Sequence, residues 1–93
     1  MTIKIGKYTF NGPYMSTNTL EDKSGVYTIE CKRDDNLYYT IDVGESHTVK
    51  SRVENHERKD CWKKNCKNGT LFYTVHYTPN LQQTGRRKIE QEI

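Results

Sequence analysis

The sequence predicts a small α+β domain whose elements follow the order β-β-α-β-α after an N-terminal arm. Three stretches rich in β-branched and aromatic residues, 25–31, 37–43 and 71–77, have the composition or the apolar–polar alternation of strands. Two others, 47–58 and 85–93, repeat apolar residues at a spacing of four, which is typical of helices. A chain of 93 residues buries one modest core. We therefore expect a single folded domain.

The first two stretches predict a β-hairpin around a polar turn at residues 32–36. The register of this hairpin stays open. An odd register places Tyr27 and Asp42 on one face of the hairpin, whereas an even register places them on opposite faces. Burial patterning favours the even register, because Ile29 then faces an apolar residue of the second strand. The third stretch carries apolar groups on both faces, which predicts a strand covered on two sides.

The N-terminal 24 residues predict an arm packed on the domain by its aromatic side chains, because Asn11-Gly12-Pro13 interrupts any regular strand there. Ser46 is a suitable N-cap for one helix over residues 47–58. In such a helix Arg52 and His56 share a face beside the apolar stripe, since they are four residues apart.

Charge and cysteine content say little about the class of partner or the cellular compartment. Fifteen Lys and Arg against twelve Asp and Glu give a net charge of +3, which permits a polyanionic partner without requiring one. No run of about 18 apolar residues predicts a membrane span, and Met1–Phe10 lacks the apolar segment of a signal peptide. The three cysteines cannot all pair, so we expect free thiols in a reducing cytoplasm. Cys61 and Cys66 alone are too few ligands for a structural zinc site.

Short motifs lie in order along these elements. Gly25-Val26-Tyr27 opens the first strand, and Asp42-Val43-Gly44 closes the second. Arg52 follows eight residues after Gly44, and His56 four residues after Arg52. A carboxylate, Glu90, lies on the last helix. Each motif alone would be weak, but the ordered set is fairly specific.

This set resembles the GIY-YIG nuclease superfamily over residues 25–93. The resemblance implies an α+β fold with a three-stranded antiparallel sheet flanked by helices, and it leaves residues 1–24 as the arm. It also implies a metal-dependent endonuclease that hydrolyses DNA phosphodiester bonds. One position departs from the family, because Asp42 stands where its second motif has a tyrosine, a leading candidate for the general base.

The resemblance implies a role for each motif residue. Glu90 would hold one Mg²⁺ or Mn²⁺ ion through hard carboxylate oxygens. Arg52 would clamp the scissile phosphate with its planar fork of donors, and His56 would relay a proton or bind the phosphate. Tyr27 or Asp42 would orient or deprotonate the attacking water.

Structural alternatives stand beside these roles. Glu90 pairs with Arg86 on the helix surface in one of them, and Glu92 replaces Glu90 as ligand if the alignment shifts by two. His56 is a core histidine in another, and Tyr27 only packs within its strand. These alternatives stay open at the level of sequence.

Further residues are candidates for contacts with nucleic acid. They are Lys50, Trp62, Lys63, Lys64, Arg86 and Arg87. The cations would follow backbone phosphates, and Trp62 would stack on a base or lie buried. Relatives usually borrow affinity from an attached DNA-binding domain. We therefore expect weak intrinsic affinity for DNA, with targeting supplied by a protein partner or a homodimer.

The alternative function is a catalytically impaired module with the same fold that binds nucleic acid or another protein. The departure at Asp42 is the residue-level reason for this alternative. Binding that persists without metal, together with no turnover under any divalent ion, would favour it.

Overall fold

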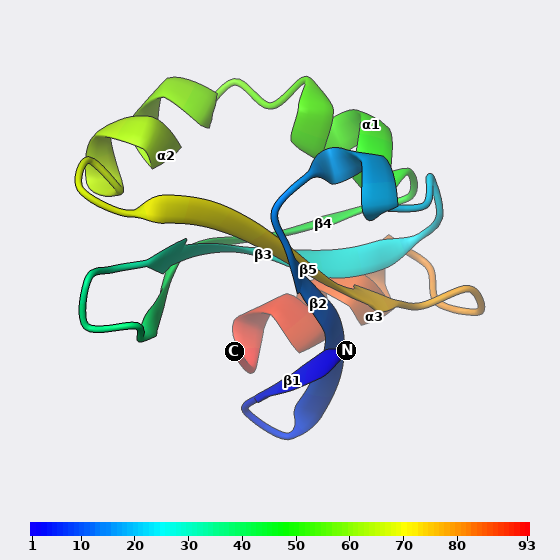
Figure 1. Cartoon of the computed structure of the whole chain (residues 1–93). Coiled ribbons are helices and arrows are strands. Elements are labelled where there is room, and N and C mark those ends of the chain that lie inside the picture. The colour runs from blue at the N-terminus through cyan, green and yellow to red at the C-terminus, as the bar shows by residue number, and fades with distance from the viewer.

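The computed structural model describes all residues from Met1 to Ile93. One antiparallel sheet has five strands in the order β1-β2-β5-β3-β4, and helices cover both of its faces (Figure 1). The elements are β1 (Thr2–Ile5), β2 (Tyr8–Tyr14), the 3-10 helix η1 (Thr17–Thr19), β3 (Gly25–Lys32), β4 (Tyr38–Ser46), α1 (Val49–Glu54), α2 (Lys59–Asn65), β5 (Thr70–Tyr77) and α3 (Gln83–Gln91). No helix is long and apolar enough to cross a membrane.

The fold is α+β, but the prediction of a three-stranded sheet is wrong. The N-terminal arm forms β1 and β2, and β2 pairs with β5. The Gly12-Pro13 step that predicted a break is accommodated by an irregularity in the pairing, where both residues stand opposite Thr74 alone. Proline, which has no N–H to donate, is tolerated at such a bulge. Gly12 has φ of 115°, a backbone conformation that favours glycine.

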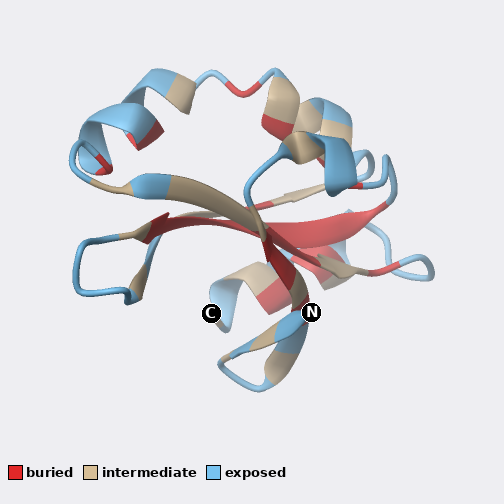
Figure 2. Cartoon of the chain, in the orientation of Figure 1, coloured by how far each residue is buried: buried red, intermediate tan, exposed pale blue.

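β3 is an interior strand of the sheet, because β4 and β5 pair with its two edges. It is buried along nearly its whole length (Figure 2). Side chains alternate between two cores. One core, under α1 and α2, contains Tyr27 and Ile29, and the other, against α3 and the N-terminal strands, contains Val26.

The prediction of one helix over residues 47–58 is also wrong. α1 ends at Glu54, and His56 lies in the connection to α2 rather than one turn beyond Arg52 on the same helix. The Lys59 ammonium donates to the Glu54 carbonyl at 2.9 Å, satisfying a carbonyl that the helix end leaves free. The break turns the chain so that α2 can pack Trp62 into the core.

The β3–β4 hairpin has both registers that the sequence left open. Near the site Tyr27 pairs with Gly44 and Ile29 with Asp42, which is an odd register, so Tyr27 and Asp42 share a face. Beyond the pair of Glu30 with Thr40 the register is even. Ile41 is the extra residue between the two halves and forms a β-bulge.

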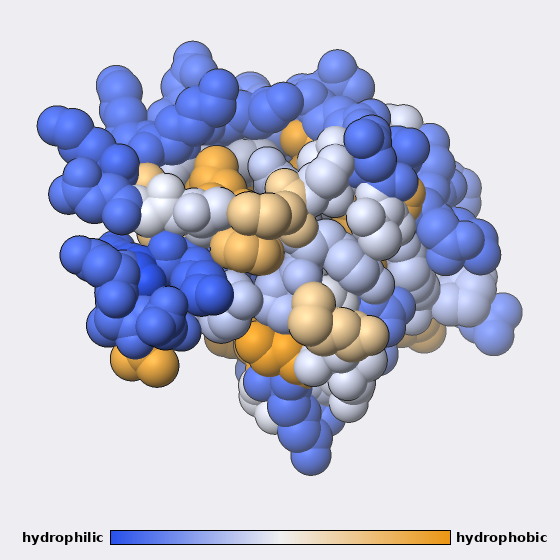
Figure 3. Space-filling view, viewed as in Figure 1, coloured by the Kyte–Doolittle hydropathy of each residue, from blue (hydrophilic) through white to orange (hydrophobic).

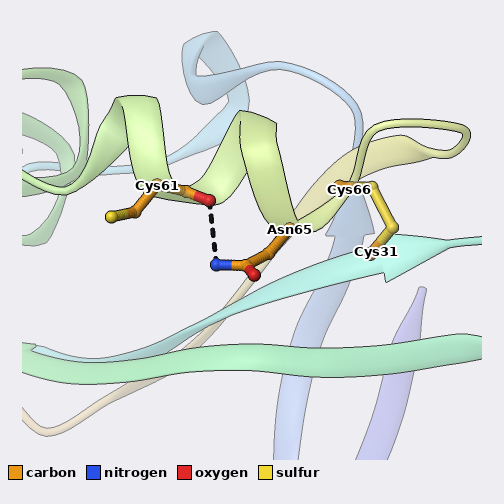
Figure 4. Close-up of a disulfide and its surroundings, with 4 residues drawn as sticks. All are labelled: Cys31, Cys61, Asn65 and Cys66. Carbon is orange, nitrogen blue, oxygen red and sulfur yellow. Dashed lines mark hydrogen bonds between the residues drawn. A yellow bond between two sulfur atoms is a disulfide. The ribbon is translucent and has the colours of Figure 1, made fainter.

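Cys31 and Cys66 form a disulfide, so the expectation of three free thiols is wrong (Figure 4). Only Cys61 is free, and its sulfur points away from the bridge. The bridge joins the end of β3 to the C-terminal cap of α2. The pairing removes the argument from free thiols that led to a reducing compartment.

The surface over α2 and the β3–β4 turn is hydrophilic, and apolar patches on the face seen in Figure 3 are small and separate. The large exposed apolar side chains Met15, Leu37 and Leu81 lie in different connections between elements. Scattered exposed apolar residues of this kind are normal on a single domain.

We expect the disulfide to contribute substantially to stability. Replacing Cys31 and Cys66 by serine removes a cross-link between residues 35 apart and should lower the free energy of unfolding by about 2–4 kcal/mol. Urea unfolding of the variant measures this loss. Cys61→Ser is the matched control and should unfold like the wild type, because Cys61 is exposed and unpaired. Equal midpoints for all three proteins would contradict the assignment of the bridge.

Candidate active site

Residues from distant parts of the sequence line one open cleft of about 470 Å³ beside the edge strand β4. α1 and the connection after it contribute from one face of the sheet, and α3 contributes from the other. The lining side chains are mostly charged. They comprise Tyr27, Asp42, Val43, Gly44, Glu45, Arg52, Arg58, Gln83, Arg87 and Glu90. Four of the five motif residues from the sequence therefore meet here.

Gly44 is required by the position of the Tyr27 ring. A Cβ atom on Gly44 would lie 2.2 Å from the phenolic oxygen and 2.3 Å from Cζ of Tyr27. The two residues are direct cross-strand partners, and Tyr27 is 2% exposed. Only glycine therefore lets the ring lie flat against β4 with its hydroxyl at the cleft.

Burial raises the pKa of Tyr27 to about 12, with the negative charge of Asp42 acting in the same direction. The positive charge of Arg52 acts against this increase. The phenol is therefore protonated at neutral pH, and it can donate or accept a hydrogen bond at the edge of the cleft.

Arg52 presents its guanidinium at the cleft and is held by an exposed carboxylate. Its two terminal nitrogens donate to the two oxygens of Glu57 at 2.7 and 2.9 Å. The bidentate pair lowers the pKa of Glu57 to about 2. This geometry is the one in which arginine binds a phosphate, so the fork is already arranged for an oxyanion.

Asp42 is engaged through both of its oxygens. Oδ2 accepts from Arg58 Nε at 2.8 Å and from Trp62 Nε1 at 2.7 Å. Oδ1 accepts from the backbone N–H of Val43 at 2.9 Å. Asp42 thereby joins β4 to α2 and to the connection that precedes it.

His56 lies beneath the cleft and is not part of its lining. The residue is 4% exposed, and its ring packs between Tyr27 and Trp62 with a ring-centre distance of 4.7 Å to Trp62. Its Nδ1 accepts from the backbone N–H of Arg58 at 3.0 Å. Burial, assisted by the charges of Arg52 and Arg58, lowers its pKa. Because Nδ1 accepts, a neutral ring carries its proton on Nε2, which is buried and has no hydrogen-bond partner within the chain.

Glu90 faces the cleft from α3, and its carboxylate makes no hydrogen bond or ion pair with a protein group. The alternative pairing with Arg86 is absent, because the Arg86 guanidinium lies near Glu45 instead, at 3.9 Å. Burial raises the pKa of Glu90, and the charge of Glu45 raises it further. Glu92 is directed elsewhere and binds Lys7 at 2.8 Å.

The cleft therefore offers Glu90 as a hard oxygen donor without an ionic partner, and Glu45, which has Arg86 3.9 Å away, as a second carboxylate. No group of three or more His, Cys, Asp or Glu side chains converges as a full metal cage. Mg²⁺ commonly binds through one or two carboxylates, keeping waters and substrate phosphate oxygens as its other ligands. The residues present fit that pattern of coordination.

The predicted nucleic-acid contacts fall into three groups. Arg87 lines the cleft. Lys63 and Lys64 are exposed on α2, and Lys50 is half-buried on α1, all outside the cleft lining. The prediction that Trp62 and Arg86 contact nucleic acid is wrong. Their exposed fractions are 2% and 6%, which leaves no free surface for a base or a backbone phosphate.

Sequence reasoning missed Glu45, Arg58 and Gln83 in the cleft. Glu45 directly follows the Asp42-Val43-Gly44 motif, which is a signal that could have found it. Arg58 was placed on a helix that the structure breaks, and no sequence pattern places it beside Asp42. Comparison of the chain with protein-family models, curated proteins and solved structures finds no match.

We expect Gly44→Ala to destabilise the domain and displace Tyr27. The added methyl overlaps a packed ring, so the free energy of unfolding should fall by about 1–3 kcal/mol. Gly85→Ala in α3 is the matched control. Its methyl would meet only Leu81, at 3.3 Å, and Leu81 is 41% exposed and free to move. Urea denaturation should show Gly85→Ala no less stable than the wild type. A neutral Gly44→Ala would mean that the ring does not occupy this position.

Proposed function

We propose that this chain is a metal-dependent endonuclease of the GIY-YIG type that hydrolyses phosphodiester bonds in DNA. The observation that carries the proposal is the meeting of Tyr27, Arg52 and Glu90 in one cleft, although they lie far apart in the sequence. The order and spacing of the motifs that hold them support the same assignment.

The proposed roles follow from the contacts of each side chain. Arg52 exchanges the carboxylate of Glu57 for the scissile phosphate and neutralises the charge that develops there. The Tyr27 hydroxyl orients the attacking water by a hydrogen bond. His56 supports this arrangement from below, packing against Tyr27 and holding the backbone of Arg58.

Glu90, with Glu45 beside it, would hold one Mg²⁺ or Mn²⁺ ion. Such an ion supplies a Lewis acid that polarises the phosphate and lowers the pKa of water. A cation would also neutralise Glu90, which has no ionic partner in the chain, and Glu45, whose partner Arg86 is 3.9 Å away. Burial of Glu90 strengthens that attraction, because a charge that has lost part of its hydration interacts more strongly with an ion.

In the proposed reaction, the water oxygen bonds to phosphorus as the bond from phosphorus to the 3′ oxygen breaks. The water gives up its proton and the 3′ oxygen gains one. The products are a 5′-phosphate and a 3′-hydroxyl, as in the family that the sequence resembles. Arg52 lies where it can stabilise the added negative charge of the transition state.

A second candidate function rests on a specific observation. Asp42 has its oxygens engaged, and the phenol of Tyr27 has a pKa of about 12, so neither of the two residues that the motifs suggest is a ready general base. A module that binds DNA without cutting it would tolerate this. Metal-independent binding of DNA without turnover would select this candidate.

We expect wild-type protein to nick supercoiled DNA in the presence of Mg²⁺ or Mn²⁺. Glu90→Gln and Arg52→Ala should each lower the rate by about 10²–10³-fold, because each removes a group that acts on developing charge. Agarose-gel conversion of supercoiled to open-circular plasmid measures the rates.

Glu92→Gln is the matched control for Glu90→Gln. Glu92 lies two residues away but binds Lys7 and Tyr8 outside the cleft, so its variant should cut at the wild-type rate. A folded wild type that cuts neither supercoiled nor branched DNA with either ion would sink the nuclease proposal.

We expect the cleavage rate to rise with pH if Tyr27 takes a proton from water. The fraction of a phenol with a pKa of about 12 that is deprotonated rises tenfold per pH unit below that value, so log kcat should rise with a slope near one between about pH 7 and 9. Tyr27→Phe should abolish both the activity and the slope. Residual activity in Tyr27→Phe with an unchanged slope would assign proton removal to hydroxide instead.

A further inference from the structure

We propose that Arg58 is a second phosphate-binding residue of the cleft and that Asp42 positions it instead of serving as a base. The inference rests on the proposed function for the identity of the ligand, a nucleic-acid phosphodiester. It assigns a role to the residue that departs from the family motif and to an arginine that no motif contains. Two hydrogen bonds support it, one that holds the backbone N–H of Arg58 and one that holds its side-chain Nε.

Asp42 has little capacity left to act on water. Its Oδ2 already accepts two hydrogen bonds, from Arg58 Nε and Trp62 Nε1, which fills both lone pairs of that oxygen. Its Oδ1 accepts from Val43 N at 2.9 Å. The Asp42 carboxylate thus accepts hydrogen bonds from three donors.

Arg58 is held by its backbone and by its side chain. The backbone N–H donates to His56 Nδ1 at 3.0 Å, and Nε donates to Asp42 at 2.8 Å. A guanidinium gripped at Nε keeps its plane fixed while its two terminal nitrogens stay available as a fork. No hydrogen bond within the chain uses those nitrogens, and the half-exposed side chain lines the cleft.

Arg52 and Arg58 differ in how ready they are for a ligand. Arg52 donates one N–H from each terminal nitrogen to Glu57, so a phosphate bound by that same fork must displace the Glu57 carboxylate. Arg58 carries its carboxylate on Nε and needs no exchange. An incoming phosphate therefore meets free donors first at Arg58, and two arginines then share its charge.

The hydrogen bonds of Asp42 with Trp62 and Arg58 explain why aspartate suits position 42. Trp62 is 2% exposed, and its indole N–H needs an acceptor. Asp42 supplies that acceptor and a counter-charge for Arg58 at the same oxygen. A tyrosine at this position would leave the Arg58 side chain without its anion.

The test is a double-mutant cycle on DNA binding without metal, with Arg58→Ala, Asp42→Asn and the double variant. A 30-base-pair duplex in EDTA is titrated by fluorescence anisotropy at several salt concentrations. Arg58→Ala should weaken binding about tenfold and reduce the slope of log K against log salt by about one. Asp42→Asn should weaken binding less. The double variant should match Arg58→Ala within about twofold, because Asp42 acts only through Arg58.

Arg33→Ala is the matched control. Arg33 lies over the Tyr39 ring at 4.8 Å in the β3–β4 turn and does not line the cleft. Arg58→Lys keeps the charge without the fork and should fall between wild type and Arg58→Ala. It also replaces Arg58→Ala in the cycle if circular dichroism shows that the alanine variant is unfolded.

The outcomes separate this inference from the nuclease proposal. If Arg58→Ala binds like Arg33→Ala, or if the losses of Arg58→Ala and Asp42→Asn multiply in the double variant, the inference is overturned. If wild type never nicks DNA but the binding cycle behaves as expected, the nuclease proposal falls and the role of Arg58 stands. If nicking by wild type and Arg58→Ala has equal kcat and KM, the nuclease proposal stands and this inference falls.

Discussion

The fold depends on burying β3 on both of its faces while both of its edges are paired. No other strand is so enclosed, and its side chains alternate between a core under α1 and α2 and a core against α3. Because the cores lie on opposite faces, helices far apart in the sequence are fixed to a common strand. The cleft lies beside the edge strand β4 and is lined from α1 and from α3, so a packing constraint places Arg52 and Glu90 around one opening.

Much of this arrangement follows from local sequence. The strand character of β3 and β5 is set by β-branched and aromatic residues, and the placement of Tyr73 and Val75 on the face of the α1 and α2 core agrees with their alternation. The meeting of Tyr27, Arg52 and Glu90 in one cleft agrees with the order of the motifs, whereas burial patterning favoured the register that would have separated Asp42 from Tyr27. These features were accessible because each is encoded by residues close together or by a pattern already associated with a fold.

The rest depends on contacts that local patterns do not encode. Gly12 and Pro13 suggested a loop, yet a bulge opposite Thr74 absorbs them within a strand. The apolar spacing of Val49 and Val53 predicted a helix that continues past Glu54, but the chain breaks there, and α2 packs Trp62 into the core. The odd number of cysteines gave no indication of which two would pair, because Cys31 and Cys66 are 35 residues apart and meet only in the folded chain.

The bulge at Ile41 divides the hairpin into two halves, and each half has its own strand register. A change in the length of the turn at residues 33–37 is absorbed on the turn side, where the strands carry no cleft residues. An insertion or deletion between Ile41 and Gly44 would instead reverse the faces of Asp42 and its neighbours. The turn side of the hairpin is thus open to variation in length, whereas the cleft side requires a fixed number of residues. The boundary between the two lies at Ile41.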